Sequence, residues 1–193
     1  MNRIFYIADT HFGHENVIKF DGRPFPNIEE METELIKRWN ETVNKKDYVY
    51  ILGDFIWKDR NKWETLPKLL NGKKILIVGN HDLRQFTPEI QENFLDIQKT
   101  MEIKDSGRRV ILCHYPMPFY RADYNENMYH LYGHVHNTDE DKLMEELRKY
   151  ILEHDNREIS KTKCQFYNAW LGYHDWKPAT LDEIIERWKE RSA

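Results

Sequence analysis

The sequence predicts a mixed α/β fold, in which two sheets pack together and helices cover their outer faces. In the first half of the chain, short apolar runs alternate with amphipathic segments of helical spacing, which favours parallel strands joined by crossover helices. In the second half, strand-like runs also follow one another without a long helix between them. The 193 residues contain no internal repeat, low-complexity stretch or Gly/Ser linker, so residues 1–193 are expected to form a single domain.

The first half is expected to form a βαβαβ unit. Its three apolar runs are predicted as buried strands because each is rich in β-forming residues and ends in a polar or glycine-containing loop. The stronger helical segment places Met31, Leu35 and Trp39 four residues apart, on one face of a helix. The expected strands are Arg3–Ala8, Asp47–Leu52 and Lys74–Val78, and the expected helices are Ile28–Val43 and Asn61–Leu70.

The second half is expected to supply the other sheet and two further helices. One helical segment is charged and amphipathic, and the other ends the sequence. The expected strands are Arg108–Cys113, Met128–Tyr132 and Cys164–Trp170, and the expected helices are Asp139–His154 and Leu181–Arg191.

The composition excludes several classes of protein. A hydrophobic fraction of 40% with 13% aromatic residues excludes a disordered chain. Aliphatic runs such as Ile75–Val78 are far shorter than the roughly 18 residues of a membrane span. Lys and Arg number 29 against 33 Asp and Glu, a net charge of −4 that argues against a protein gripping long nucleic acid by its phosphates. Two cysteines, Cys113 and Cys164, make no disulfide framework and predict a reducing, cytoplasmic compartment.

Polar side chains follow five of the predicted strands, at the point where each strand ends. In open α/β sheets, ligands bind beyond the carboxyl ends of the strands, so these groups can converge. Each group alone is weak, because a single His near a strand end is often structural and Gly-Asp is often a turn. The ordered set is more specific: Asp9-Thr10-His11, Gly53-Asp54, Gly79-Asn80-His81-Asp82, His114-Tyr115-Pro116 and Gly133-His134-Val135-His136.

This ordered set resembles the calcineurin-like metallophosphoesterase superfamily, and the length and the phrase Ala8–His14 resemble its small bacterial and phage-type phosphohydrolases. The resemblance implies a four-layer αββα sandwich of two mixed sheets flanked by helices, with a dinuclear metal site. The larger protein Ser/Thr phosphatases extend their second motif as Gly-Asp-x-x-Asp-Arg-Gly. Here the motif continues as Phe55-Ile56-Trp57 after Asp54, so protein-phosphatase activity is not expected.

The resemblance also implies the roles of the metal ligands. Asp and His together suit transition ions, with Mn²⁺ expected first and Fe, Zn²⁺, Co²⁺ or Ni²⁺ as alternatives. By family position, one metal is expected on Asp9, His11 and His136 and the other on Asn80, His114 and His134, with Asp54 as the bridge.

His81 and Asp82 are expected to be catalytic. His81 resembles the family's non-ligand histidine, which hydrogen-bonds the leaving oxygen and can protonate it, and imidazole suits this work. Asp82 is expected to orient His81, and its alternative role is that of a turn or cap residue.

Three residues are expected to contact the substrate. His14 can touch the phosphate, or it can simply begin a helix. Tyr120 and Arg121 lie in a loop between two ligand motifs, where an aromatic ring and an arginine can stack a base and hold a phosphate, or pack under the loop. A comparable candidate rim after the second motif is formed by Trp57, Lys58 and Arg60.

The leading hypothesis is a metal-dependent phosphoesterase acting on a small phosphate mono- or diester, with a nucleotide or cyclic nucleotide as one form of substrate. The alternative in the same superfamily is a nuclease or RNA-processing phosphodiesterase, which the acidic balance and the lack of a basic stripe disfavour. A third hypothesis is a non-catalytic scaffold on the same fold. A scaffold is expected to have lost ligands, and all seven ligand positions are kept here.

Overall fold

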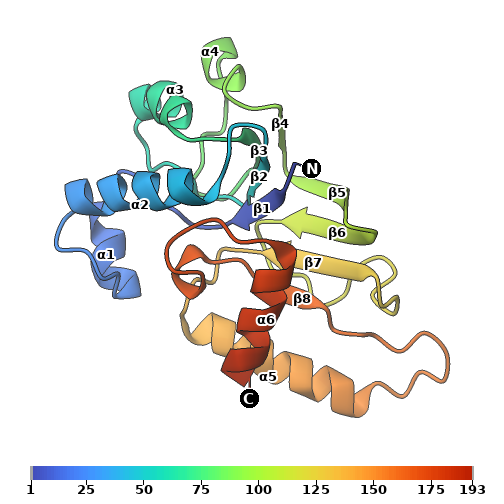
Figure 1. Cartoon of the computed structure of the whole chain (residues 1–193). Helices are drawn as coiled ribbons and strands as arrows, with labels where there is room; N and C mark the ends of the chain where they lie inside the picture. Colours follow the sequence, from blue (N-terminus) through green and yellow to red (C-terminus); the bar gives the residue numbers. More distant parts are fainter. Residues whose placement is uncertain (1, 193) are drawn as a thin grey trace.

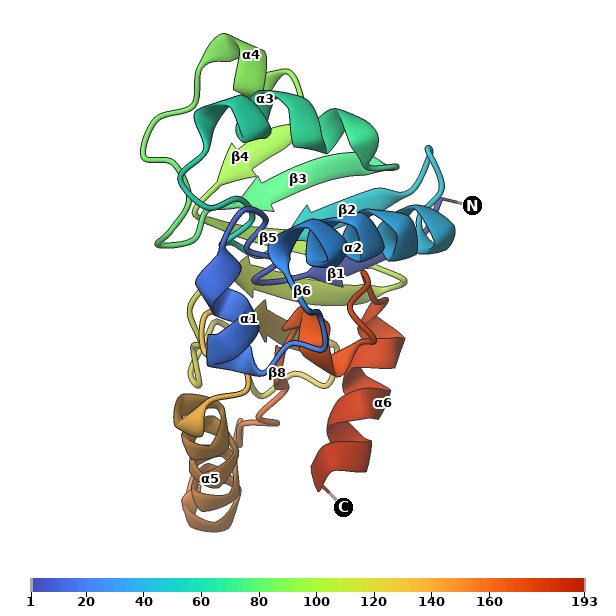
Figure 2. The same cartoon turned by 90° about the vertical axis from the view of Figure 1, so that its left-hand side faces the viewer.

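In a computed structural model, which describes residues 2–192, the chain forms two four-stranded sheets. The first sheet has the strand order β1-β2-β3-β4, and all of its strands are parallel. Their carboxyl ends therefore share one edge of the sheet (Figure 2). The strands are β1 (Ile4–Ile7), β2 (Tyr48–Ile51), β3 (Lys73–Ile77) and β4 (Asp96–Gln98).

The second sheet has the order β5-β6-β7-β8 and is mixed. The hairpin of β5 and β6 is antiparallel, and β6, β7 and β8 run parallel. Of the two sheets expected to be mixed, this one is mixed. The four strands of the first sheet are parallel, and within residues 2–192 that sheet has an antiparallel neighbour at the isolated bridge between Tyr6 and Ala179. The strands are β5 (Thr100–Asp105), β6 (Arg108–Cys113), β7 (Met128–Tyr132) and β8 (Phe166–Asn168).

Side-chain caps fix where the long helices begin. Asn27 accepts a hydrogen bond from the backbone N–H of Glu30 at 2.8 Å and so starts α2. Asp59 caps α3 and Thr138 caps α5 in the same way. The helices are α1 (Glu15–Asp21), α2 (Ile28–Thr42), α3 (Arg60–Leu69), α4 (Pro88–Gln91), α5 (Asp139–His154) and α6 (Leu181–Ser192), with one 3₁₀ turn, η1 (Leu171–Tyr173).

Three apolar clusters hold four layers together. The first packs α2 and α3 on the outer face of the first sheet, where Trp39 and Trp63 are buried against Phe55. The second lies between the two sheets, and the third packs α5 on the second sheet. Figure 1 shows α2 and α3 on one side of the sheets and α5 on the other. This arrangement confirms the predicted sandwich of two sheets flanked by helices.

The sequence prediction omitted five elements: α1, α4, β4, β5 and the 3₁₀ turn η1. The helices α1 and α4 span only two turns or less, so their apolar spacing is too brief to stand out. The strand β5 does alternate, with Met101 and Ile103 packed inward, and that period-two pattern was a usable signal.

No helix within residues 2–192 is long and apolar enough to cross a membrane. Both cysteines, Cys113 and Cys164, are free thiols buried in the fold.

Candidate metal centre

The polar groups that follow the strands do meet at one place. Asp9 and His11 come after β1, Asp54 after β2, His114 directly after β6, and His136 shortly after β7. Since the first three strands are parallel, their carboxyl ends bring these side chains to one edge of the first sheet, facing the ends of β6 and β7. The convergence predicted from the sequence is therefore present.

Four of these residues form a compact group of ligand atoms. Nitrogen and oxygen atoms of Asp9, His11, Asp54 and His136 all lie within 4.8 Å of one another. The Nε2 atoms of His11 and His136 face each other at 3.2 Å. A carboxylate oxygen stands 3.6 Å from each ring, Asp54 Oδ2 at His11 and Asp9 Oδ1 at His136. Two imidazoles and two carboxylates around one point fit a single cation well, and one metal ion can contact all four.

The electrostatics of this group favour binding of a cation. Burial lowers the pKa of His11 well below its ordinary value, so the ring is neutral and available as a ligand. Burial acts to lower the pKa of His136 as well, but the charges of Asp9 and Asp21 outweigh it and raise that pKa. Burial also raises the pKa of Asp9. A bound cation would replace the proton that these groups otherwise share.

The remaining three candidate ligands lie on the other side of Asp54. His114 Nδ1 is 2.8 Å from the backbone oxygen of Leu52, and because a carbonyl only accepts, Nδ1 must donate. Its Nε2 then turns a lone pair toward Asn80 Oδ1 at 2.8 Å and Asp54 Oδ2 at 3.5 Å. The ring of His134 lies 5.1 Å from that of His114. Lone pairs that converge with no donor between them fit a second cation.

The backbone around the centre is tightly constrained. Five of the seven candidate ligands have positive φ angles of 45° to 73°, a region costly for residues with a Cβ. A Cβ on Gly53 would meet His114 Nδ1 at 2.3 Å, and a Cβ on Gly79 would meet Asp54 Oδ1 at 2.3 Å. Glycine at these two places lets the ligand side chains approach the neighbouring loop. The five ligands with positive φ are Asp9, His11, Asp54, His134 and His136.

Two functional residues were not predicted from the sequence, Asp21 and Arg23. Asp21, at the end of α1, accepts a hydrogen bond from His136 Nδ1 at 2.8 Å, which turns Nε2 of that ring toward the centre. The buried guanidinium of Arg23 binds Asp21 Oδ2 at 2.7 Å and donates to the backbone oxygens of Asp9 and Thr10. Glycine at Gly22, which ends α1 with φ 61°, was the available signal.

His81 stands at the rim of the centre. Its backbone N–H donates to Asp54 Oδ1 at 2.9 Å, and its ring centroid lies 5.8 Å from that of His11. Asp82 points elsewhere: its carboxylate accepts from the backbone N–H groups of Gly79, Asp54 and Phe55. Its hydrogen bonds within residues 2–192 shape these loops and do not reach the ring of His81, so the expectation that Asp82 orients His81 is replaced by its loop-bracing alternative.

A pocket of about 460 Å³ opens over the ligand group, lined among others by His11, His134 and His136. One wall is aromatic. His14 stacks on Trp57 with ring centroids 3.9 Å apart and planes 9° apart, and Phe20 lies edge-on to His14. His14 and Trp57 therefore both line the pocket, and a contact of His14 with the substrate stays a prediction.

A family model described as the calcineurin-like phosphoesterase superfamily domain matches residues 2–155, which include every candidate ligand. The chain belongs to this superfamily. The resemblance inferred from the motifs is confirmed, and the chain is a hydrolase of phosphate esters.

Three relatives show how far the likeness extends along this phosphoesterase. The uncharacterised protein MJ1445 of Methanocaldococcus jannaschii is 34% identical over 188 residues, which is 96% of this chain and 91% of that protein. The Gene 66 protein of Mycobacterium phage D29 is 29% identical over 164 residues, with 70% of this chain and 79% of that protein covered. The crystal structure of AQ665 from Aquifex aeolicus, a protein of unknown function, has a TM-score of 0.60, 26% identity, and coverage of 96% and 99%.

Two predicted substrate contacts lie outside the pocket of this phosphoesterase. The half-buried Tyr120 packs under its loop against His130, with ring centroids 5.7 Å apart, and burial raises its pKa. Arg121 is exposed and pairs with Glu102 of β5 at 3.2 Å. Neither side chain lines the pocket, so the loop has its alternative, structural role.

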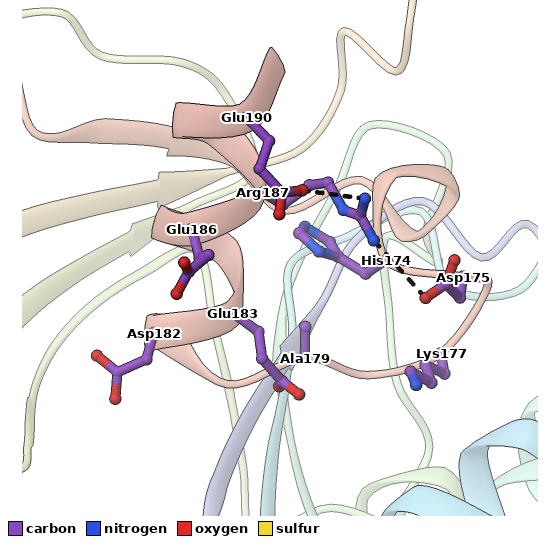
Figure 3. A pocket seen from close by; sticks show the side chains of 9 residues that line it. All are labelled: His174, Asp175, Lys177, Ala179, Asp182, Glu183, Glu186, Arg187 and Glu190. Carbon is purple, nitrogen blue, oxygen red and sulfur yellow. Dashed lines mark hydrogen bonds and ion pairs between the residues drawn. The ribbon is translucent and has the colours of Figure 1, made fainter. Parts of the chain in front are cut away.

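A separate hollow lies between α6 and residues 174–179 (Figure 3). It is lined by Glu183, Glu186, Arg187 and the buried ring of His174, among others. None of the candidate metal ligands reaches it, so it is distinct from the phosphoesterase centre.

Proposed function

We propose that this phosphoesterase hydrolyses a small phosphate mono- or diester, with nucleotides as one class, by means of two divalent transition ions, Mn²⁺ first among them. The observation that supports two ions is the position of Asp54. Its Oδ2 lies 3.6 Å from His11 Nε2 and 3.5 Å from His114 Nε2, so one oxygen can serve both halves of the centre. One ion would lie on Asp9, His11 and His136, and the other on Asn80, His114 and His134.

The charge of such a centre suits a phosphate. Two divalent ions would face only two ligand carboxylates, Asp9 and Asp54, because Asn80 binds through a neutral amide oxygen. The centre therefore stays locally positive although the whole chain carries −4. When bound, the ions would neutralise phosphate charge and lower the pKa of an attacking water.

His81 would act on the leaving group. Its ring lines the pocket beside the ligands, and the hydrogen bond from its backbone to Asp54 fixes the position of its Cα. Water adds its oxygen to phosphorus, the P–O bond to the alcohol breaks, and the electron pair stays on the alcohol oxygen. His81 would give that oxygen its proton, and the attacking water supplies the replacement.

Replacement of His81 tests this proposal. After chelation and reloading with Mn²⁺, His81→Ala should keep two ions and a normal melting temperature. Its rate on a nucleoside monophosphate should fall on the order of 10²–10⁴-fold, because the departing nucleoside is an alcohol and a poor leaving group. On 4-nitrophenyl phosphate, whose leaving group departs without a proton, the loss should be much smaller.

His114→Ala is the matched control, because it removes a ligand and should lose metal and activity on both substrates alike. Equal losses on both substrates in His81→Ala, with metal intact, would show that His81 is not the acid. Hydrolysis that survives complete chelation would overturn the metal mechanism, and absence of hydrolysis after metal loading would favour the scaffold hypothesis.

A further inference from the structure

The metal centre lies between two hollows at the same edge of the first sheet. On one side is the aromatic pocket already described. On the other is a groove of about 430 Å³ between residues 78–86 and the end of β4. The candidate ligand Asn80 lines the groove and the next residue, His81, lines the pocket, so adjacent residues of one loop face the two hollows. In Figure 2 the strands β3 and β4 end side by side at this edge.

The groove is cationic. Arg84 and Lys99 line it, both are exposed, and within residues 2–192 neither forms an ion pair. The acidic residue of the groove, Asp82, is buried, and backbone N–H groups occupy both of its oxygens. The groove therefore offers two positive charges to a ligand, with no free carboxylate among its lining residues, while the Nε2 of Gln98 donates to Asp96 Oδ1 at 3.0 Å.

The pocket on the other side has a different character. Phe20 is 73% exposed at its mouth, next to the stacked pair His14 and Trp57. The exposed ring of Phe20 beside the half-buried pair suits a planar ring such as a nucleobase, which can stack on it. Glu140 also lines this pocket, so it disfavours a second phosphate there.

We infer that the substrate is a phosphodiester with one aromatic arm in the pocket and one arm carrying a further phosphate in the groove, as in a short phosphorylated oligonucleotide. This inference rests on the proposed function and specifies its substrate. A monoester has a single organic substituent and needs one hollow, whereas a diester has two. In the reaction, the oxygen of water bonds to phosphorus, one ester P–O bond breaks, and the departing oxygen takes a proton. One arm thus leaves as an alcohol and the other as a phosphomonoester.

The test compares a dinucleoside monophosphate with the same dinucleotide carrying a terminal 5′ or 3′ phosphate, on the Mn²⁺-loaded enzyme. For one of these isomers we expect KM to be about tenfold lower than for the unphosphorylated dinucleotide, since its terminal phosphate gains charge-assisted hydrogen bonds in the groove. In the double variant Arg84→Ala/Lys99→Ala this ratio should fall to about one.

The double variant Lys45→Ala/Lys46→Ala is the matched control. It also removes two exposed positive charges, but from the loop before β2, at the amino ends of the strands and away from the groove. Its KM ratio should equal that of the wild-type enzyme, and melting curves should show both variants folded. A second readout is salt, because the advantage of the terminal phosphate should shrink as salt rises.

Bis(4-nitrophenyl) phosphate distinguishes failure of the groove inference from failure of the proposed function, since it is a diester without a further phosphate. If the wild-type enzyme cleaves this ester but gives a KM ratio near one for both dinucleotide isomers, the groove inference is wrong and the proposed function stands. If it cleaves neither esters of this kind nor monoesters, the proposed function itself fails. A ratio that falls equally in both double variants would also overturn the inference, because the effect would then be one of net charge.

Discussion

The metal centre has two halves that are supported in different ways. The first half contains Asp9, His11 and His136, the second contains Asn80, His114 and His134, and Asp54 lies between them. His136, in the first half, is held by a buried charged pair: Asp21 accepts from its Nδ1, and Arg23 binds Asp21 and the backbone beneath the centre. Burial acts to raise the pKa of Asp21, but the hydrogen bond from His136 and the charge of Arg23 outweigh it and lower that pKa. This half is therefore braced by charge.

In the second half, the ring of His114 and the loop that follows it are held by neutral groups. The carbonyl of Leu52 orients His114, and the loop after His114 is fixed by Met117, whose N–H donates to the Nε2 of buried His130 at 3.1 Å. His130 Nδ1 lies 3.1 Å from the backbone oxygen of Ile111 and donates to it. Two halves that share one carboxylate can thus differ in how tightly they hold an ion and in how they respond to acid.

The largest effect is expected where the halves meet. Asp54→Asn keeps the shape of the side chain but removes the charge that both halves share. The affinity for both ions should therefore fall by more than the roughly 10–100-fold that is typical when a residue supporting a ligand is replaced. Metal content after dialysis and phosphoesterase rate measure this. Retention of two ions at near-normal affinity would contradict the shared role of Asp54.

A smaller and one-sided effect is expected at Asp21. Asp21→Ala removes the partner of His136 and leaves Arg23 buried without its carboxylate. The affinity of the first half for its ion should therefore fall by about 10–100-fold, and the melting temperature should fall as well. Asp21→Asn can still accept from His136 and should lose less. Chelator competition on the two variants measures both ions, and equal weakening of the two ions would erase the contrast between the halves.

The smallest expected effect is a pH dependence of the free energy of unfolding, which comes from His130 beside the second half. Burial lowers the pKa of His130 from 6.5 to about 4. Between these values the unfolded chain binds a proton that the folded chain does not, so the free energy of unfolding should fall as pH falls from 6.5 toward 4. In His130→Gln, which cannot titrate, denaturant unfolding should show a flatter dependence. Parallel curves for the two proteins would mean that His130 does not couple this half to pH.

The sequence was sufficient to predict that the candidate ligands meet, because they lie where buried strands end. Asp54 comes shortly after β2 and His114 directly after β6. Parallel pairing aligns the strand ends within each sheet, and the packing of the two sheets brings the two sets of ends together. Asp21 could not be predicted this way. It lies on a short helix, and its contact with His136 depends on how α1 folds back over the ends of the strands, 115 residues away in sequence.

The loop that carries Tyr120 shows the other limit. An aromatic residue beside an arginine has the same sequence pattern whether it faces a substrate or packs inward. The packing of Tyr120 against His130 decides the matter, and His130 belongs to a strand whose face the loop pattern does not specify. The sequence alone likewise does not distinguish the positions of Lys45 and Arg84. The parallel sheet places Lys45 at the amino ends of the strands and Arg84 at their carboxyl ends, near the metal centre.

The left-handed backbone at five ligand positions has a consequence for the evolution of this chain. At each of them the L side chain costs about 1–2 kcal/mol that glycine would avoid. Selection for thermal robustness alone would therefore drive positions such as His11 and His136 toward glycine, and selection for turnover would restore imidazole there. Thermal stability and activity therefore favour different residues at these five positions. A laboratory lineage selected only for heat resistance should accumulate substitutions first at the carboxyl ends of the strands, where the metal centre lies.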